Sequence, residues 1–162
     1  MTTIADLRVD EITWSAATPL RRAEWRVCRD EVVEEGRFAP TLAGRYLLAT
    51  PNEHAVVVEA LDDQGYVQRA LHLERLLLQD VVHEYAAIIR RLDENADRRD
   101  ASWFEAVDMA KKVVHDKAAN AILRVPDFAV DLPTARRVFT FYFALVVDTT
   151  RMQHARGHRI LR

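Results

Sequence analysis

The chain has 162 residues, of which 49% are hydrophobic and 30% are charged, and its formal net charge is −2 at pH 7. This balance is typical of one globular domain, so a disordered or collagen-like chain is excluded. The nearly neutral charge gives no overall attraction to nucleic acid or to anionic lipid.

The positions of the cysteine, the histidines and the apolar residues restrict the class of protein further. Cys28 is the only cysteine, so no internal disulfide can form and a reducing compartment is favoured. His54, His72, His83 and His115 lack the H-x-x-x-H or H-x-H spacing of metal ligands, and no phosphate-loop or dinucleotide motif occurs. The longest apolar run is about half as long as a membrane span requires. We therefore expect a cytoplasmic protein with no metal, no cofactor and no membrane association.

The amino-terminal part predicts a strand followed by a helix. Leu7 to Trp14 has strand-like alternation that switches parity midway, which indicates a bulge. Thr18 followed by Pro19 is a typical helix start, because the hydroxyl can cap free amides and proline suits the first turn. Gly36 is the expected end of this helix.

Three short strands are expected next, because runs rich in Val, Leu and Tyr are separated by turn residues. Two tight connections in succession predict an antiparallel meander, since parallel neighbours need a longer crossover. One face of the sheet is expected to contact water. The runs are Arg45–Thr50, His54–Leu61 and Tyr66–Leu73.

From Leu76 onward the apolar residues recur every three to four positions, which predicts a core-facing helix that ends near Leu92. The polar segment 93–100 is expected to be a loop between two helices. The change of period therefore separates a strand-rich first half from a helical second half.

A further helix is predicted after Ser102, which forms a capping box with Glu105. Its apolar stripe is interrupted at Lys117, so the helix is expected to end or bend there. Met109 and Val113 are placed on its buried side. The opposite side collects four polar residues, since offsets of three, four and seven residues return to one helix face. They are Asp108, Lys111, Lys112 and His115.

The last helix is predicted to begin near Asp131 and Pro133. From Val138 to Val147 it is apolar almost all the way round, which indicates burial on several sides, either as the central helix of the domain or in a subunit interface. Arg136 and Arg137 lie in its first turns, where cations oppose the helix dipole. Free backbone amides and two guanidinium groups are the ingredients of an anion site.

The predicted order is strand, helix, three strands and three helices, which gives an α+β fold. We expect an antiparallel sheet of three to four strands, with about four helices packed mainly on one face. Residues 1–150 are expected to form a single domain, and residues 151–162 a basic tail. The tail carries Arg151, Arg156, Arg159 and Arg162.

Two segments carry a resemblance to a known family. AVDMAKKVVHDK and VDLPTARRVFT resemble the two best-defined motifs of the bacterial uncharacterised protein family 0262, and weaker similarity spans most of the chain from about Phe38 to Val147. The resemblance implies a small bacterial cytoplasmic protein, and it implies no particular activity.

The polar residues of the last two long helices form the candidate site. The simplest interpretation is a solvated helix face with an i,i+4 salt bridge, and with Arg136 and Arg137 paired to nearby acids. The acids considered for this pairing are Asp108, Asp127 and Asp131. The functional alternative is an anion-binding cluster of Asp108, Lys111, Lys112, His115, Arg136 and Arg137.

Two functions of different classes follow from these features. The first is a non-enzymatic interaction or regulatory protein that self-associates into a homo-oligomer or binds another protein, as the apolar last helix indicates. The alternative is a small enzyme or binding protein for a phosphate- or carboxylate-bearing ligand at the candidate site. Contact with nucleic acid is expected only through the basic tail, which has no aromatic residue for base stacking.

Overall fold

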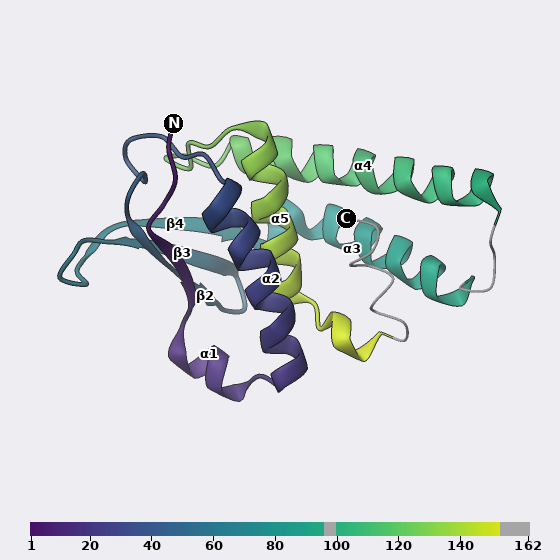
Figure 1. The fold of residues 1–162 in the computed structure, drawn as a ribbon, viewed down its shortest axis with the longest axis horizontal. Coiled ribbons are helices and arrows are strands. Elements are labelled where there is room, and N and C mark those ends of the chain that lie inside the picture. Colours follow the sequence, from purple (N-terminus) through teal and green to yellow (C-terminus); the bar gives the residue numbers. More distant parts are fainter. Residues whose placement is uncertain (96–99, 153–162) are drawn as a thin grey trace.

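A four-stranded sheet forms one layer of the fold, and helices cover one of its faces (Figure 1). The computed structural model describes residues 1–95 and 100–152. Within them the strands lie in the order β1-β2-β3-β4, and the predicted α+β class is confirmed. The strands are β1 (Asp6–Val9), β2 (Tyr46–Pro51), β3 (Ala55–Leu61) and β4 (Val67–Glu74).

The helices pack as a central group and a projecting pair. Thr18 caps α2 as predicted, because its hydroxyl accepts a hydrogen bond from the backbone N–H of Arg21 at 3.2 Å. α3 and α4 pack together as a hairpin that extends away from the sheet (Figure 1). The helices of the described residues are α1 (Glu11–Ala16), α2 (Pro19–Glu35), α3 (Arg75–Glu94), α4 (Ala101–Leu123), α5 (Leu132–Val146) and the short 3-10 turn η1 (Thr149–Arg151).

The sheet is mixed, which corrects the predicted antiparallel arrangement. β2, β3 and β4 form the expected antiparallel meander, but β1 pairs with β2 in parallel. The chain between β1 and β2 includes α1 and α2, and it is long enough for the crossover that a parallel pair requires. Sequence periodicity does not report where such a crossover returns, so the pairing of β1 could not be predicted from it.

β1 is shorter than the predicted strand Leu7–Trp14. Asp10 ends it by capping α1, because its Oδ2 accepts a hydrogen bond from the backbone N–H of Thr13 at 3.2 Å. Trp14 therefore lies in a short helix, where its ring centroid is 6.1 Å from that of Trp25. The parity switch in the sequence marks a change from strand to helix, so the predicted bulge is wrong.

Side chains alternate between the two faces of the sheet. The inner face packs against α2 and α5, where Leu47 and Val56 line a small internal void together with Val32 and Phe141. Apart from Ala55, the outer face has partly or fully exposed side chains, so the expectation that one face contacts water is confirmed. The buried residues of the inner face are Leu7, Leu47, Ala49, Val56, Val58, Ala60, Leu71 and Leu73.

α4 is longer than predicted. It runs without a break past Lys117 to its end, and Asp100 caps it in place of the predicted Ser102. Lys117 does not interrupt the helix, because its Nζ lies 3.3 Å from Glu84 Oε2 at the exposed edge of the contact with α3. The buried residues continue beyond this point with Ala118.

The buried and exposed sides of α4 also differ from the prediction. Met109 and Val113 are 63% and 47% exposed, although the sequence placed them in the core. Lys111 is only 4% exposed, although the sequence placed it in solvent. Apolar residues occur on both sides of this helix, so their stripe does not identify the side that faces the core.

α5 is the central helix of the fold. It packs against α2 and α4, and its residues 138–145 are all buried. The indole Nε1 of Trp25 donates a hydrogen bond to the carbonyl O of Ala144 at 2.8 Å, and Arg21 Nη2 donates to that of Leu145 at 3.0 Å. The predicted burial is confirmed, and the same chain covers this helix.

The predicted basic tail lies mostly outside the described residues. Arg151 belongs to η1, and its Nε lies 3.1 Å from Asp148 Oδ2. Arg156, Arg159 and Arg162 lie outside the described ranges. In the part of the chain that is described, no helix combines the length and apolar character that crossing a membrane requires.

Candidate functional site

The six residues predicted to form an anion site take part in separate contacts. Asp108 and Lys112 form an i,i+4 ion pair, with 3.0 Å between Oδ2 and Nζ, and both side chains are well exposed. This arrangement matches the solvated helix face that the sequence allowed. Because the pair is in contact with water, it contributes little to stability.

Arg136 and Arg137 are paired with acids from two different helices. Arg136 Nε donates a hydrogen bond to Asp116 Oδ1 of α4 at 2.8 Å, and Arg137 pairs with Glu35 at the end of α2. The ion pairing expected from the sequence is present. Both arginines hold α5 against a neighbouring helix, so their charges are already compensated.

The acids that the sequence offered as partners have other contacts. Asp127 lies 3.5 Å from Arg69 of β4, and Asp108 pairs within its own helix. Asp131 caps α5, because its Oδ1 accepts a hydrogen bond from the backbone N–H of Thr134 at 2.9 Å. The predicted identity of the partner acids is therefore wrong, and the helix packing determines which acid each arginine meets.

Asp131 should make the stability of the fold depend on pH. Burial alone would raise its pKa, but the hydrogen bonds from Thr134 and the charges of Arg137 and Arg37 lower the pKa below its ordinary value. The ionised form therefore stabilises the fold above a pH of about 4, and this contribution is lost as the pH falls through the folded-state pKa. Asp131→Ala should lower the free energy of unfolding at neutral pH by about 0.5–2 kcal/mol, as for other lost helix caps.

Urea unfolding at a series of pH values checks this expectation. Asp131→Asn is the matched control, because asparagine retains a cap acceptor but does not titrate. Its stability should fall less than that of the wild type between about pH 5 and pH 3. Equal losses in the two proteins would show that Asp131 does not contribute to the pH dependence.

Lys111 and His115 lie against the aromatic core between α3 and α5. The imidazole of His115 packs on Tyr85 and Phe139, with ring centroids 5.0 and 5.6 Å apart. Lys111 Nζ lies 5.9 Å from the centroid of the Tyr85 ring. These two residues face the core, whereas Asp108 and Lys112 on the same helix face solvent.

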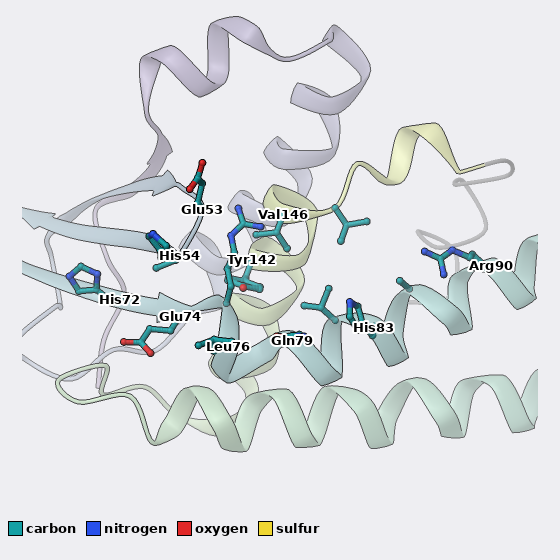
Figure 2. A pocket seen from close by; sticks show the side chains of 15 residues that line it. Glu53, His54, His72, Glu74, Leu76, Gln79, His83, Arg90, Tyr142 and Val146 are labelled. Atoms are coloured by element: carbon teal, nitrogen blue, oxygen red, sulfur yellow. The ribbon is translucent and has the colours of Figure 1, made fainter.

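A groove of about 730 Å³ lies where one end of the sheet meets α3 and the carboxyl end of α5 (Figure 2). Small-molecule sites commonly have volumes of about 300–1,000 Å³. None of the six residues predicted as an anion site lines this groove. The structure therefore directs attention to a different set of side chains.

One face of α3 forms a wall of the groove, because positions three and four residues apart on a helix face the same way. Arg75 and Arg90 stand at the two ends of this face, about 22 Å apart along the helix axis. The groove is therefore elongated along α3, as Figure 2 shows. The lining residues of α3 are Arg75, Leu76, Gln79, Val82, His83, Ala86 and Arg90.

The turn between β2 and β3 builds the sheet end of the groove. Asn52 Oδ1 accepts hydrogen bonds from the backbone N–H groups of His54 and Ala55 at 2.8 and 2.9 Å. The backbone N–H of Arg75 donates to His54 O at 2.8 Å, and Arg75 Nε donates to Asn52 O at 2.7 Å. These bonds hold Glu53, His54 and Arg75 at the groove.

Tyr142 of α5 lines the middle of the groove beside Val146 and Val147. Its side chain is 1% exposed. Burial raises the pKa of Tyr142, and the nearby charge of Arg75 opposes this rise. The phenol therefore stays neutral at physiological pH, where it can act as a hydrogen-bonding group but not as a base.

The two ends of the groove differ in charge (Figure 2). His83 and Arg90 lie at one end, and within the described residues the acids that line the groove, Glu53 and Glu74, lie at the other. Arg90 makes no ion pair in the described part of the chain. The sheet end combines the two carboxylates with Arg75. The end of the groove with Arg90 therefore carries a positive charge.

His54, His72 and His83 line the groove although they are scattered in the sequence. The pairing of β3 with β4 places Ala55 opposite Glu74, which brings the start of one strand next to the end of the other. That pairing is the signal that could have located this end of the groove. No group of three or more His, Cys, Asp or Glu side chains in residues 1–95 and 100–152 is arranged to hold a metal ion.

These features define a small α+β protein with a groove beside a buried central helix, and the groove has an apolar middle and charged ends. The chain belongs to the Uncharacterised protein family UPF0262, which matches residues 1–148, so the family suggested by the sequence is confirmed. A UPF0262 protein from Sphingopyxis alaskensis is 30% identical over 153 residues, which cover 88% of this chain and 92% of the relative. One from Dinoroseobacter shibae is 25% identical over 155 residues, 90% of this chain and 98% of the relative. No solved structure matches the chain.

Proposed function

We propose that the protein binds a small molecule that carries a carboxylate or phosphate group, with this group at the His83–Arg90 end of the groove. The observation that supports this most directly is Arg90, a guanidinium that lines the groove and has no acidic partner in the described residues. Guanidinium groups suit carboxylates and phosphates because they offer two parallel donors. His83 lies about two helical turns earlier on the same face and adds a further polar group.

The lining of the groove favours an organic ligand over a free inorganic ion. Val82, Ala86, Val146 and Val147 line its middle, and covering such apolar surface with hydrocarbon is favourable. Small-molecule sites typically combine apolar walls with a few placed polar groups. The groove has both components.

Self-association is the other function that the sequence suggests, and the reason for it is the apolar last helix. α5 is covered within the same chain by α2, α4 and the inner face of the sheet, so its apolar surface needs no partner. A ligand site in the groove is therefore the function that the geometry supports better.

Arg90→Met should weaken the binding of a carboxylate or phosphate ligand by about 10- to 150-fold, because hydrogen bonds to charged groups contribute about 1.5–3 kcal/mol. A thermal-shift screen of organic acids and phosphates selects the ligand, and calorimetry then compares the variants. Arg91 offers the matched control, since it is the next residue of α3, is exposed and does not line the groove. Arg91→Met should bind as the wild type does.

Two results would contradict the proposal. One is a screen in which no acid or phosphate raises the melting temperature. The other is an equal loss of affinity in Arg90→Met and Arg91→Met, which would indicate a general effect of positive charge on α3.

A further inference from the structure

We infer that the hydroxyl of Tyr142 is a second ligand-binding group of the groove, and that it donates a hydrogen bond to a carbonyl oxygen near the far end of a long aliphatic acid. This inference rests on the proposed function, because the acid group of the same ligand is placed beside Arg90. The unpaired hydroxyl, the charges around it, the aliphatic wall and the length of α3 support it.

Tyr142 has a hydroxyl group that the fold itself does not use. Its side chain is 1% exposed and lines the groove, and its hydroxyl makes no hydrogen bond within the described residues. Native proteins rarely leave a buried polar group without a partner. Figure 2 shows the oxygen of Tyr142 among the side chains that line the groove. The partner therefore has to come from the groove, where an acceptor atom of a ligand can replace water.

The charges around Tyr142 favour a neutral acceptor. Arg75 is close enough for its charge to oppose the rise in the pKa of Tyr142, and its Nε is already bonded to the carbonyl O of Asn52. Glu53 and Glu74 line the adjoining end of the groove, so no net positive charge awaits a second anion there. A carbonyl oxygen, by contrast, accepts the hydrogen bond without bringing a charge.

The wall between Arg90 and Tyr142 favours a saturated chain. Val82 and Ala86 of α3 line this part of the groove, and Val146 follows Tyr142 by one turn of α5. Among the described residues, no Trp or Phe lines the groove. A nucleobase would therefore lack the large aromatic face on which bases commonly stack. A methylene chain would gain from contact with the aliphatic wall.

The length of α3 sets the length of the ligand. Arg75, whose charge reaches Tyr142, lies about 22 Å from Arg90 along the helix axis. A hydrogen bond of about 3 Å at each end leaves about 16 Å for the ligand itself. Because a C–C bond is about 1.5 Å long and the chain zigzags, twelve carbons span about 15 Å and eight carbons only about 10 Å. A chain of about twelve carbons can therefore contact both groups, whereas an eight-carbon chain reaches only one of them.

Calorimetry on the full chain tests this inference with two acids of equal length. Dodecanoate and 11-oxododecanoate differ only in one carbonyl group near the end of the chain. 11-Oxododecanoate should bind about 2- to 12-fold more tightly, as expected for one additional neutral hydrogen bond. The shorter pair, octanoate and 7-oxooctanoate, should not show this preference, because neither acid reaches from Arg90 to Tyr142.

Tyr142→Phe separates the hydrogen bond from packing, because phenylalanine keeps the ring. The variant should lose the preference for 11-oxododecanoate and bind dodecanoate as the wild type does. Its melting temperature should stay close to that of the wild type, since no hydrogen bond among the described residues is lost. Tyr66→Phe is the matched control, because Tyr66 is 69% exposed and does not line the groove. Arg90→Met should weaken the binding of both twelve-carbon acids.

The outcomes distinguish this inference from the proposed function. A preference for 11-oxododecanoate that persists in Tyr142→Phe, or that is absent from the wild type, would overturn the role of Tyr142 and leave the anion site at Arg90 in place. Binding of shorter acids without binding of the twelve-carbon acids would have the same meaning. If no acid or phosphate of any length binds, the proposed function fails as well.

Discussion

Replacing Phe139 with alanine should lower the free energy of unfolding by about 3–5 kcal/mol, as for other buried Phe-to-Ala changes. Phe139 is fully buried, and its ring lies 5.8 Å from that of Tyr85 and 6.2 Å from that of Phe143, centroid to centroid. The substitution would leave a cavity where α3, α4 and α5 meet. Most of the loss should therefore come from packing contacts that neighbouring side chains cannot restore.

Urea unfolding followed by circular dichroism measures this loss. Met109→Ala is the matched control, because Met109 is 63% exposed on α4 and its removal should change stability by no more than about 0.5 kcal/mol. The loss of stability in Phe139→Leu should lie between the losses in Phe139→Ala and Met109→Ala. Similar losses for Phe139→Ala and Met109→Ala would contradict both the central position of α5 and the exposed side of α4.

Gly36→Ala should destabilise the fold by about 3 kcal/mol, at the upper end of what overpacking usually costs. A Cβ at this position would overlap the carbonyl oxygen of Val32 and come within 2.7 Å of Phe38 Cε2. Val32 O also accepts the hydrogen bond from Gly36 N that ends α2, so it cannot move away freely. Phe38 is fully buried and has equally little room.

The comparison with Glu34→Ala isolates this effect, because Glu34 lies in the same turn of α2 and is exposed. Its replacement should change stability by about 0.5 kcal/mol or less. Thermal unfolding of the two variants gives the difference directly. A stability of Gly36→Ala equal to that of the wild type would mean that the chain after α2 can shift without loss.

Gly36 ends α2, as the sequence predicts, but the reason is not the usual one for a glycine at the end of a helix. Glycine commonly ends helices because it tolerates a left-handed backbone. Its φ is −66°, which any residue can adopt, so the backbone angle does not require glycine here. The requirement comes from the approach of Phe38, which belongs to the next segment and cannot be seen from the local sequence.

The sequence predicts best the features that depend on residues close together in the chain. The turns between the strands of the meander and the caps of α2 and α5 depend on residues within a few positions of each other. The parallel pairing of β1, the full length of α4 and its buried side depend on what packs against them. Lys111 illustrates this point, because its place against Tyr85 exists only after α3 and α4 have come together.

The groove could not be predicted because α3, α5 and the strand ends build it together, and local spacing does not show how these elements pack. Glu53 precedes β3 and Glu74 ends β4, so a whole hairpin separates them in the sequence, and Arg90 follows after most of a long helix. The sequence points to Arg136 and Arg137 because charged residues are concentrated there. In the structure, ion pairs with acids of neighbouring helices balance the charges of both arginines. The proposed ligand site depends instead on Arg90, which lines the groove and has no acidic partner among the described residues.

The contacts at the carboxyl end of α5 bear on how the chain reaches its native state during synthesis. Trp25 and Ala144, which share a buried hydrogen bond, are 119 positions apart in the sequence. α2 and the inner face of the sheet leave the ribosome long before α5 exists to cover them. Their apolar surfaces must stay uncovered or be shielded by other proteins until α5 has been synthesised, and chains with such exposed surfaces are prone to aggregate. Chains that terminate before α5 should therefore be targets for chaperones and proteases.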